Sequence, residues 1–334
     1  MPTRLHRSVE VAAVGALVTQ SLERYGYSVG SGVELIGDSE NLTYRVVAAA
    51  DRPEAILRVY RQGYHSIEAI RSELCWLQAL RRESKVVIPA VIPADDGSLC
   101  IEMRNEVIPE GRRFVLFELL SGREPQEHEL VESFLRLGEV TALLHEHAAN
   151  WTLPEGFVRH SWNLDTMLLA REPTWGRWQH NEDLSPDALA VLTKAEAVIV
   201  RRLEDFGSRR ANFGVIHADL RPQNLLFDGK TTKVIDFDDC GFSWYLYDLG
   251  AALTFVEDHP SSDTMVQQWI TGYEAVRTLT SLEKEELDTF RLLRRLIVIA
   301  WLASHQETMT AQTFNAGYTE RAAAAARRYL RRFG

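Results

Sequence analysis

The sequence contains few cysteines and no long uncharged apolar segment. Its cysteines are Cys75, Cys100 and Cys240, and no two of them form a C-x-x-C pair. An odd set of widely separated cysteines is typical of reduced thiols in a cytoplasm. No stretch reaches the length of about eighteen apolar residues that a membrane-spanning helix requires. These absences predict a cytoplasmic protein that has no membrane as its partner.

Basic residues are also in deficit. The chain has 37 lysines and arginines against 47 aspartates and glutamates, which gives a formal net charge of −10. A surface that binds DNA or RNA must supply cations to displace the counterions of the phosphates. We therefore predict no nucleic-acid partner, and we interpret the basic stretch 327–332 as the solvated end of a helix.

What the chain does have is the composition of a soluble globular protein, with 46% hydrophobic and 25% charged residues in a length of 334. That length suffices for two domains, or for one large domain divided by a cleft. The first apolar run, at 11–18, follows Arg4 and Arg7 and superficially imitates a signal peptide. Glu10 at the edge of the run favours an amphipathic helix instead.

Two different periodicities divide the chain. The first part is rich in alternating β-branched and aromatic residues, which predict antiparallel strands such as 42–47, and helical spacing predicts a helix at 67–82. Later the pattern becomes helical, most clearly in 282–332. We therefore predict an α+β fold of two lobes with a cleft between them. The small antiparallel-sheet lobe is 1–118, and the larger, mainly helical lobe is 119–334.

The most informative part of the chain is an apolar hairpin flanked by polar residues. Its two short strands are joined by an Asp-Gly dipeptide, which is typical of tight turns. An antiparallel hairpin brings its two ends together, so Asn224 and Asp236 are predicted to lie side by side although twelve positions separate them. Asp219 precedes Asn224 by five residues, on the loop that enters the hairpin.

These side chains suit phosphoryl transfer. A carboxylate and a carboxamide presented together are hard oxygen ligands, which Mg²⁺ accepts when phosphates and water complete its coordination. A carboxylate on the entering loop can orient an attacking hydroxyl or accept its proton. ATP-dependent phosphoryl transfer needs both features. An isolated Asp or Asn after a strand is usually a turn former or helix cap. Here a second acidic group, Asp236, follows a hairpin of the length needed to bring it beside Asn224.

The string H-A-D-L-R-P-Q-N, which starts at His217, and the string I-D-F-D after the hairpin resemble loops of a known superfamily. They are similar to the catalytic and metal-binding loops of the aminoglycoside phosphotransferase and choline kinase superfamily, which shares its fold with protein kinases. The resemblance implies that Asp219 is the catalytic aspartate, that His217 braces its loop, and that ATP and Mg²⁺ are the cofactors. It assigns Mg²⁺ to Asn224 and Asp236, with Asp238 as a further ligand.

The upstream chain agrees with the same family in order and spacing. Residues 37–46 resemble its phosphate-covering hairpin, which lacks the three glycines of protein kinases and places Ser39 and Asn41 at the nucleotide. Arg58 occupies the position of the strand lysine that contacts the α- and β-phosphates, and Glu73 that of its partner on the next helix. The alternative for this last pair is a surface ion pair of little energetic worth.

Two further segments complete the expected site. Phe117 to Leu120 resembles the hinge whose main chain binds adenine, so Glu118 and Leu120 are expected there. Arg221 stands two residues after the catalytic aspartate, where serine/threonine protein kinases carry lysine, and is expected to stabilise the transferring phosphoryl group. The arginine at position 58 departs from the family pattern, because a guanidinium is a wide planar fork whereas an ammonium is a compact point charge.

Other polar and aromatic residues have simpler explanations. Asp248 is expected to cap or anchor the catalytic loop. His145 and His147 point to different faces of one helix and are not expected to share a metal. The tryptophans at positions 151, 162, 175 and 178 are interpreted as packing of an irregular insert, in preference to a cage for a cationic substrate. The resemblance implies that the acceptor pocket is built from 151–183 and from the helices after Leu282.

Three functions fit these residues. The first is transfer of the γ-phosphate of ATP to a hydroxyl of a small molecule, such as an amino alcohol, aminoglycoside, sugar or homoserine, and is favoured because no A-P-E segment follows Asp236. The second is a serine/threonine protein kinase of the bacterial stress-response type, suggested by I-D-F-D-D and by Arg221. The third is a nucleotide-binding regulator without transfer activity, suggested by Arg58. We predict the first function. The sequence identifies neither the acceptor nor the oligomeric state.

Overall fold

The structure is a computed structural model that describes residues 4–28, 30–38, 41–47, 49 and 52–334. The chain divides into two compact units. The N-terminal unit consists of Met1–Glu83, Val87–Ser121 and Pro154–Val158. The C-terminal unit consists of Ser84–Val86, Gly122–Leu153 and Arg159–Gly334.

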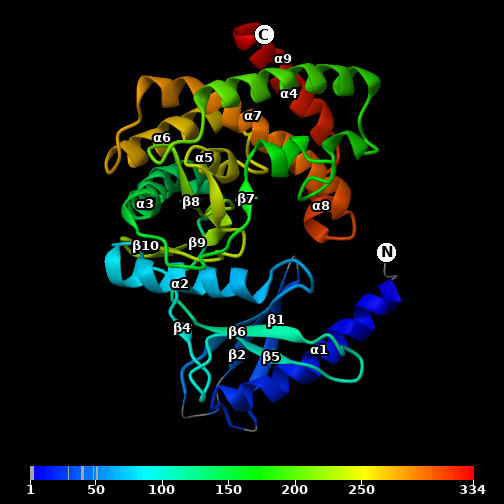
Figure 1. Ribbon diagram of the computed structural model, residues 1–334, viewed down its shortest axis with the longest axis vertical. Helices are drawn as coiled ribbons and strands as arrows, with labels where there is room; N and C mark the ends of the chain where they lie inside the picture. The colour runs from blue at the N-terminus through cyan, green and yellow to red at the C-terminus, as the bar shows by residue number, and fades with distance from the viewer. Residues whose placement is uncertain (1–3, 29, 39–40, 48, 50–51) are drawn as a thin grey trace. The chain divides into compact units, whose positions relative to one another are not determined.

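The N-terminal unit is built on an antiparallel sheet with helices (Figure 1). The strands run in the order β1-β2-β3-β6-β4, and β5 also pairs with β6. They are β1 (Gly32–Asp38), β2 (Leu42–Val47), β3 (Ala55–Val59), β4 (Val91–Ile92), β5 (Ile101–Met103) and β6 (Arg112–Glu118). The helices are α1 (Arg4–Arg24) and α2 (Ile67–Glu83).

Alternation of side chains along the strands creates the core of this unit. Tyr44 and Val46 of β2 are buried together with Leu57 of β3, as expected for a sheet with one covered face. Val14 and Leu17 of α1 belong to the same buried cluster, so α1 packs on the sheet. The strand predicted over β2 and the helix predicted over the first apolar run are confirmed.

Helix α2 buries the apolar stripe that its sequence spacing indicated. Ile70, Leu74, Leu77 and Leu80 recur at helical intervals, and all four are buried. The predicted range 67–82 differs from the observed helix by one residue at its end.

The C-terminal unit is mainly helical (Figure 1). Its helices are α3 (Leu130–Asn150), α4 (Pro186–Phe206), α5 (Tyr247–Ala252), α6 (Ser262–Glu274), α7 (Ser281–Ser304), α8 (Met309–Phe314) and α9 (Tyr318–Phe333). The short helical turns are η1 (Glu127–Glu129), η2 (Asp165–Leu169), η3 (Trp178–His180) and η4 (Pro222–Asn224). Its strands are β7 (Ser161–Trp162), β8 (Phe213–Ile216), β9 (Leu225–Asp228), β10 (Thr231–Val234) and β11 (Gly241–Trp244). Strands β9 and β10 form a hairpin, and the other three form a sheet in the order β7-β11-β8.

Helices α3 and α6 approach each other at two glycines. Gly138 of α3 lies against the main chain at Trp269, and Gly272 of α6 lies against the main chain at Leu135. A Cβ atom added at either glycine would collide with a carbonyl oxygen of the opposite helix. The absence of side chains at these two positions therefore permits the close crossing.

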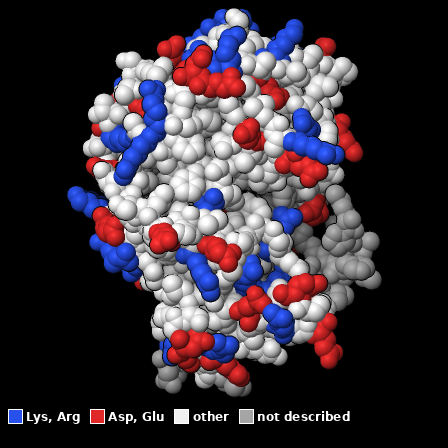
Figure 2. All heavy atoms as spheres, in the orientation of Figure 1, with Lys and Arg blue, Asp and Glu red and all other residues white. Residues whose placement is uncertain are grey.

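The charged side chains on the surface and the state of the three cysteines are as the composition indicated. On the face drawn in Figure 2, acidic and basic side chains are interspersed. Cys75, Cys100 and Cys240 are all free thiols, as their spacing predicted. Within the part of the chain that the structure describes, no helix combines the length and the apolar character needed to cross a bilayer.

Candidate active site

The predicted hairpin forms and fixes the polar groups at its ends. Strands β9 and β10 pair antiparallel, with Val234 opposite Leu225. One step further, the main-chain N–H of Ile235 donates to the carbonyl oxygen of Asn224 at 3.0 Å. Asp236 follows Ile235 directly, so the hairpin brings Asn224 to the start of the I-D-F-D string.

Two residues of this region have unusual backbone conformations. Ala218, which precedes Asp219, has a φ of 67°, and Asp236 has a φ of 65°. Residues other than glycine rarely adopt positive φ, and such strained conformations cluster at functional sites. The strain persists only where neighbouring groups hold the backbone in place.

Asp248 of α5 supplies part of that support. Its carboxylate accepts hydrogen bonds from the main-chain N–H groups of His217 at 3.2 Å and of Ala218 at 2.7 Å. Its Oδ2 also lies 3.0 Å from Nε2 of His145, whose Nδ1 lies 2.9 Å from the hydroxyl of Tyr273. All five residues are buried. Asp248 therefore anchors the loop, as its place in the sequence predicted.

His145 has a structural contact that the sequence did not reveal. Burial lowers the pKa of its imidazole, although the Asp248 carboxylate opposes the change. A neutral ring satisfies both contacts, because Nε2–H donates to the carboxylate and Nδ1 accepts from the Tyr273 hydroxyl. His147 instead has its ring 5.6 Å from that of Trp151, so the two histidines do not share a site. Among the described residues, no cluster of three or more His, Cys, Asp or Glu side chains is arranged to hold a metal by itself.

The carboxylate of Asp219 lies between two arginines. Its Oδ1 accepts from Nη2 of Arg294 at 2.8 Å, and its Oδ2 accepts from Nε of Arg221 at 3.1 Å. The side-chain amide of Asn224 donates to the main-chain oxygen of Asp219 at 2.8 Å. The Asp219 side chain is 18% exposed, so the carboxylate still meets solvent.

Arg294 was not among the site residues predicted from the sequence. It lies on α7, 75 positions after Asp219. Arg294 and Arg295 interrupt an otherwise apolar helical run, and this is the available signal, because arginines are seldom buried without a partner. Local sequence does not name that partner.

The other predicted residues of this segment lie close to the hairpin. Nε2 of His217 lies 3.1 Å from the main-chain oxygen of Ile235, and this contact supports the predicted bracing role. Asn224 uses its amide nitrogen as a donor to the main chain, which leaves its carbonyl oxygen to accept a ligand. Asp236 is exposed, whereas Asp238 is buried.

The N-terminal unit holds the predicted pair of Arg58 and Glu73. Nη1 of Arg58, on β3, lies 2.8 Å from Oε1 of Glu73, on α2. Their exposed fractions are 8% and 0%, so the alternative of a surface ion pair is wrong. The hydroxyl of Tyr60 donates to the other oxygen of Glu73 at 3.1 Å, and the Arg58 guanidinium carbon lies 5.1 Å from the ring centroid of Phe117.

Three of the four remaining predicted nucleotide residues, Asn41, Glu118 and Leu120, are among the described residues. Ser39 lies outside the described residues. Oδ1 of Asn41 accepts from the main-chain N–H of Arg61 at 2.9 Å, which is a contact within the unit. The main-chain N–H of Glu118 donates to Ala90 at 2.9 Å and is thus engaged in the sheet. Leu120 follows β6 and is half-buried.

Two tryptophans of the insert support packing over a cage. Trp162 and Trp178 are buried. Their indole N–H groups donate to the main-chain oxygen of Asp239 and to a carboxylate oxygen of Glu196, each at 2.8 Å. A satisfied, buried indole belongs to the core, so the packing interpretation is confirmed for these two residues.

Comparison with known proteins adds the family. Residues 32–284 match the model of the phosphotransferase enzyme family. The chain belongs to this family. This phosphotransferase is 24% identical over 250 residues to the amicoumacin kinase of Bacillus subtilis (strain 168), an alignment that covers 73% of the chain and 68% of that protein. It is 27% identical to the homoserine kinase of Sinorhizobium medicae (strain WSM419), with 62% of the chain and 59% of the relative covered.

Solved structures give the same result. The phosphotransferase is similar to the microcompartment-associated aminopropanol kinase, with a TM-score of 0.87, 41% identity, and coverage of 94% of this chain and 97% of the other. It is also similar to an amicoumacin kinase in complex with AMP-PNP, Ca²⁺ and Ami, with a TM-score of 0.76, 17% identity and coverage of 96% of each chain. The predicted family, protein-kinase-like fold and enzyme class are confirmed, and the chain is an ATP-dependent small-molecule kinase.

Proposed function

We propose that this phosphotransferase moves the γ-phosphate of ATP to the hydroxyl of a small amino alcohol, with Mg²⁺ as the metal. The observation that carries the proposal is the segment around the β9-β10 hairpin, where Asn224 is bonded to the main chain of Ile235 and of Asp219 and where Asp248 anchors the loop before Asp219. The 41% identity to an aminopropanol kinase supports an amino alcohol as the acceptor. A kinase of the same fold is in complex with AMP-PNP and Ca²⁺, which supports a nucleotide with a divalent metal.

Each side chain of the C-terminal segment has a distinct role in this proposal. Asp219 orients the acceptor hydroxyl and accepts its proton. Arg221 is the more exposed of the two arginines on Asp219 and turns towards the transferring phosphoryl group. Asn224 and Asp236 hold the metal, with Asp238 as a further ligand.

The donor set fits Mg²⁺ when the nucleotide is included. The side chains offer hard oxygen atoms but too few for six-fold coordination, so phosphates and water supply the rest. This agrees with the lack, among the described residues, of a self-sufficient acidic or histidine cluster. When bound, the metal neutralises charge on the β- and γ-phosphates.

The nucleotide contacts of the N-terminal unit follow from the same assignment. Arg58, fixed by Glu73, contacts the phosphates. The hairpin that carries Asn41 covers them, and the main chain around Leu120 binds adenine.

The test is ATP turnover with a panel of acceptors, measured as ADP release and by mass of the product. We expect turnover with 1-amino-2-propanol and ethanolamine, and little with an aminoglycoside, a sugar or homoserine. Asp219→Asn is expected to lower kcat about 100-fold or more, because it removes the proton acceptor. Asp205→Asn, an exposed acid on α4, is the matched control and should leave kcat unchanged.

The same assay separates the alternatives. Transfer of label from ATP to protein, with none to small molecules, would favour the protein kinase. ATP binding without turnover for any acceptor would favour the regulator and overturn the proposal.

A further inference from the structure

Arg294 is a buried residue of α7, and all three nitrogen atoms of its guanidinium donate hydrogen bonds. Its exposed fraction is 4%. Nη2 donates to Oδ1 of Asp219 at 2.8 Å, and Nη1 donates to the main-chain oxygen of Ala218 at 3.3 Å and to the hydroxyl of Tyr247 at 3.1 Å. Nε donates to the hydroxyl of Thr254 at 3.0 Å. One guanidinium therefore ties the carboxylate of Asp219 and the backbone before it to α5 and the chain that follows it.

The contact with Ala218 meets the strained part of the loop. Ala218 has a φ of 67°. Its N–H donates to Asp248 at 2.7 Å and its carbonyl oxygen accepts from Arg294 at 3.3 Å. Hydrogen bonds thus hold the peptide groups on both sides of Ala218. A strained conformation persists only when its surroundings hold it in this way. Arg294 thus contacts both the backbone before Asp219 and the Asp219 carboxylate itself.

The two arginines on Asp219 differ in how firmly they are held. The Arg294 side chain is 5% exposed, whereas that of Arg221 is 24% exposed. Burial opposes the charge of Arg294, but Tyr247 and Asp219 beside it raise its pKa overall, so it stays charged. Arg294 is therefore the buried partner of Oδ1, whereas Oδ2 accepts from the more exposed Arg221 and, at 3.4 Å, from the side-chain amide of Asn224.

We propose that Arg294 is a positioning residue, which holds Asp219 through Oδ1 so that Oδ2 faces the acceptor hydroxyl once Arg221 turns away. The inference rests on the proposed function, because it takes Asp219 as the group that meets the acceptor. A buried guanidinium is costly to desolvate and is a weak source of stability. Its place in the fold is explained when it fixes the reacting carboxylate.

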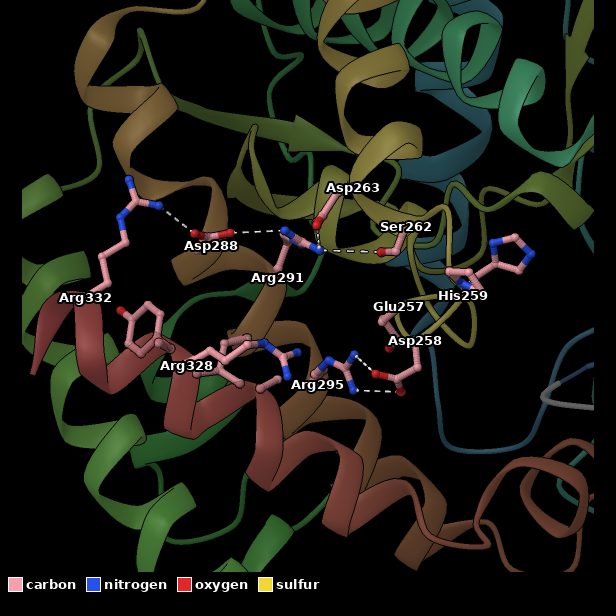
Figure 3. Close-up of a pocket in the computed structure, with 14 residues that line it drawn as sticks. Glu257, Asp258, His259, Ser262, Asp263, Asp288, Arg291, Arg295, Arg328 and Arg332 are labelled. Atoms are coloured by element: carbon pink, nitrogen blue, oxygen red, sulfur yellow. Dashed lines mark hydrogen bonds and ion pairs between the residues drawn. The ribbon is translucent and has the colours of Figure 1, made fainter.

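The neighbouring Arg295 offers a matched control. It is also 4% exposed and also paired, but with Asp258, at 2.6 Å and 3.1 Å. Figure 3 shows this pair beside Arg328. These three residues line a cavity of about 550 Å³, and Asp219 is not part of its lining. Substitution of either arginine by lysine removes the planar fork from a buried site on the same helix.

The experiment compares Arg294→Lys with Arg295→Lys in steady-state kinetics and in urea unfolding. Arg294→Lys is expected to lower kcat about 100-fold with the KM for ATP nearly unchanged, since small misplacements of a reacting group are this costly. Arg295→Lys is expected to shift the urea midpoint by a similar amount but to leave kcat unchanged. Equal kcat values for the two variants would overturn the inference.

A double-mutant cycle isolates the route through Asp219. If Arg294 acts on catalysis through that carboxylate, Arg294→Lys changes the residual kcat of Asp219→Asn by no more than about twofold. A merely structural arginine would instead lower kcat by the same factor in both backgrounds. Absence of turnover in the wild-type enzyme with every acceptor would overturn the proposed function and this inference together, whereas an active wild type with an unaffected Arg294→Lys overturns the inference alone.

Discussion

Glu73 is a fully buried carboxylate with Arg58 and Tyr60 as partners. A buried ion pair gains little net free energy, because desolvation of both charges opposes their attraction. Removing one partner is different, since it leaves the other charge buried without compensation. At the scale of single residues, this asymmetry makes the pair a sensitive place to test the N-terminal unit.

Glu73→Gln is therefore expected to lower the free energy of unfolding by about 3 kcal/mol. It should also raise the KM for ATP, because Arg58 loses the group that fixes it. Urea unfolding and steady-state kinetics measure the two effects. Glu68→Gln, at an exposed position of the same helix, is the control. Equal free energies of unfolding for Glu73→Gln and Glu68→Gln would contradict the claim that Glu73 and Arg58 form a buried ion pair.

Asp258 gives a prediction for pH. Burial acts to raise its pKa, but Arg295 and Arg321 outweigh burial and lower it. A carboxylate with a depressed folded-state pKa stabilises the fold above the unfolded value of about 3.9, and this stabilisation is lost as the pH falls through the folded value.

We expect the urea midpoint of the wild type to fall between about pH 5 and pH 2 more steeply than that of Asp258→Asn. At pH 7 the variant should be the less stable protein, because Arg295 remains buried without its counter-charge. Asp205→Asn should keep the wild-type slope. Parallel slopes for all three proteins would show that Asp258 does not contribute in this pH range.

At the scale of elements, the sequence predicts what local patterns encode. The spacing of apolar residues gave α2 to within one residue, and the Asp-Gly turn gave the β9-β10 hairpin. The contact between Arg294 and Asp219 was not predictable in this way, because 75 positions separate the two residues. Periodicity indicates that a helix is buried, but not which loop each of its faces meets. For the same reason the motif predicted the pair of Arg58 and Glu73 but not its complete burial.

Helix crossings also depend on contacts between residues far apart in the sequence. Alanine substitutions at two glycines are expected to change the free energy of unfolding in opposite directions. Gly272→Ala is expected to lower the free energy of unfolding by about 1–3 kcal/mol, because the methyl group meets the main chain of α3 at Leu135. Gly15→Ala, in α1, should raise it by up to about 1 kcal/mol, because an added Cβ there has no neighbour within 4 Å. Urea unfolding of the two variants checks both signs. A stabilised Gly272→Ala would contradict the close crossing of α3 and α6.

At the scale of the whole molecule, both units contribute to one family assignment. The match to the phosphotransferase family extends over residues 32–284, which include the sheet of the N-terminal unit and the hairpin segment of the C-terminal unit. The chain carries a net charge of −10. In the function that we propose, the metal and the arginines supply the positive charge that a triphosphate needs.

Chelation of divalent metal with EDTA is accordingly expected to abolish turnover, and added Mg²⁺ should restore it. If Asp236 holds the metal as we propose, Asp236→Asn should raise the Mg²⁺ concentration for half-maximal turnover at least about tenfold, because the site loses one carboxylate ligand. Asp238→Asn should have a smaller effect, since we propose this side chain only as a further ligand. Full activity of Asp236→Asn at low Mg²⁺ would remove this residue from the metal site.

Arg294 and Arg295 are adjacent on α7 yet serve different carboxylates. Consecutive helical residues point about 100° apart, so the rotational phase of α7 decides which side chain reaches Asp219. That phase is counted from the capping box of Thr280 and Glu283, where the helix begins. One residue inserted between this cap and Arg294 would present Leu293 to the carboxylate, whereas one residue deleted would present Arg295. The position at which α7 begins thus determines which side chain faces Asp219. The enzyme should tolerate the deletion of one residue before Arg294 better than the insertion of one residue there.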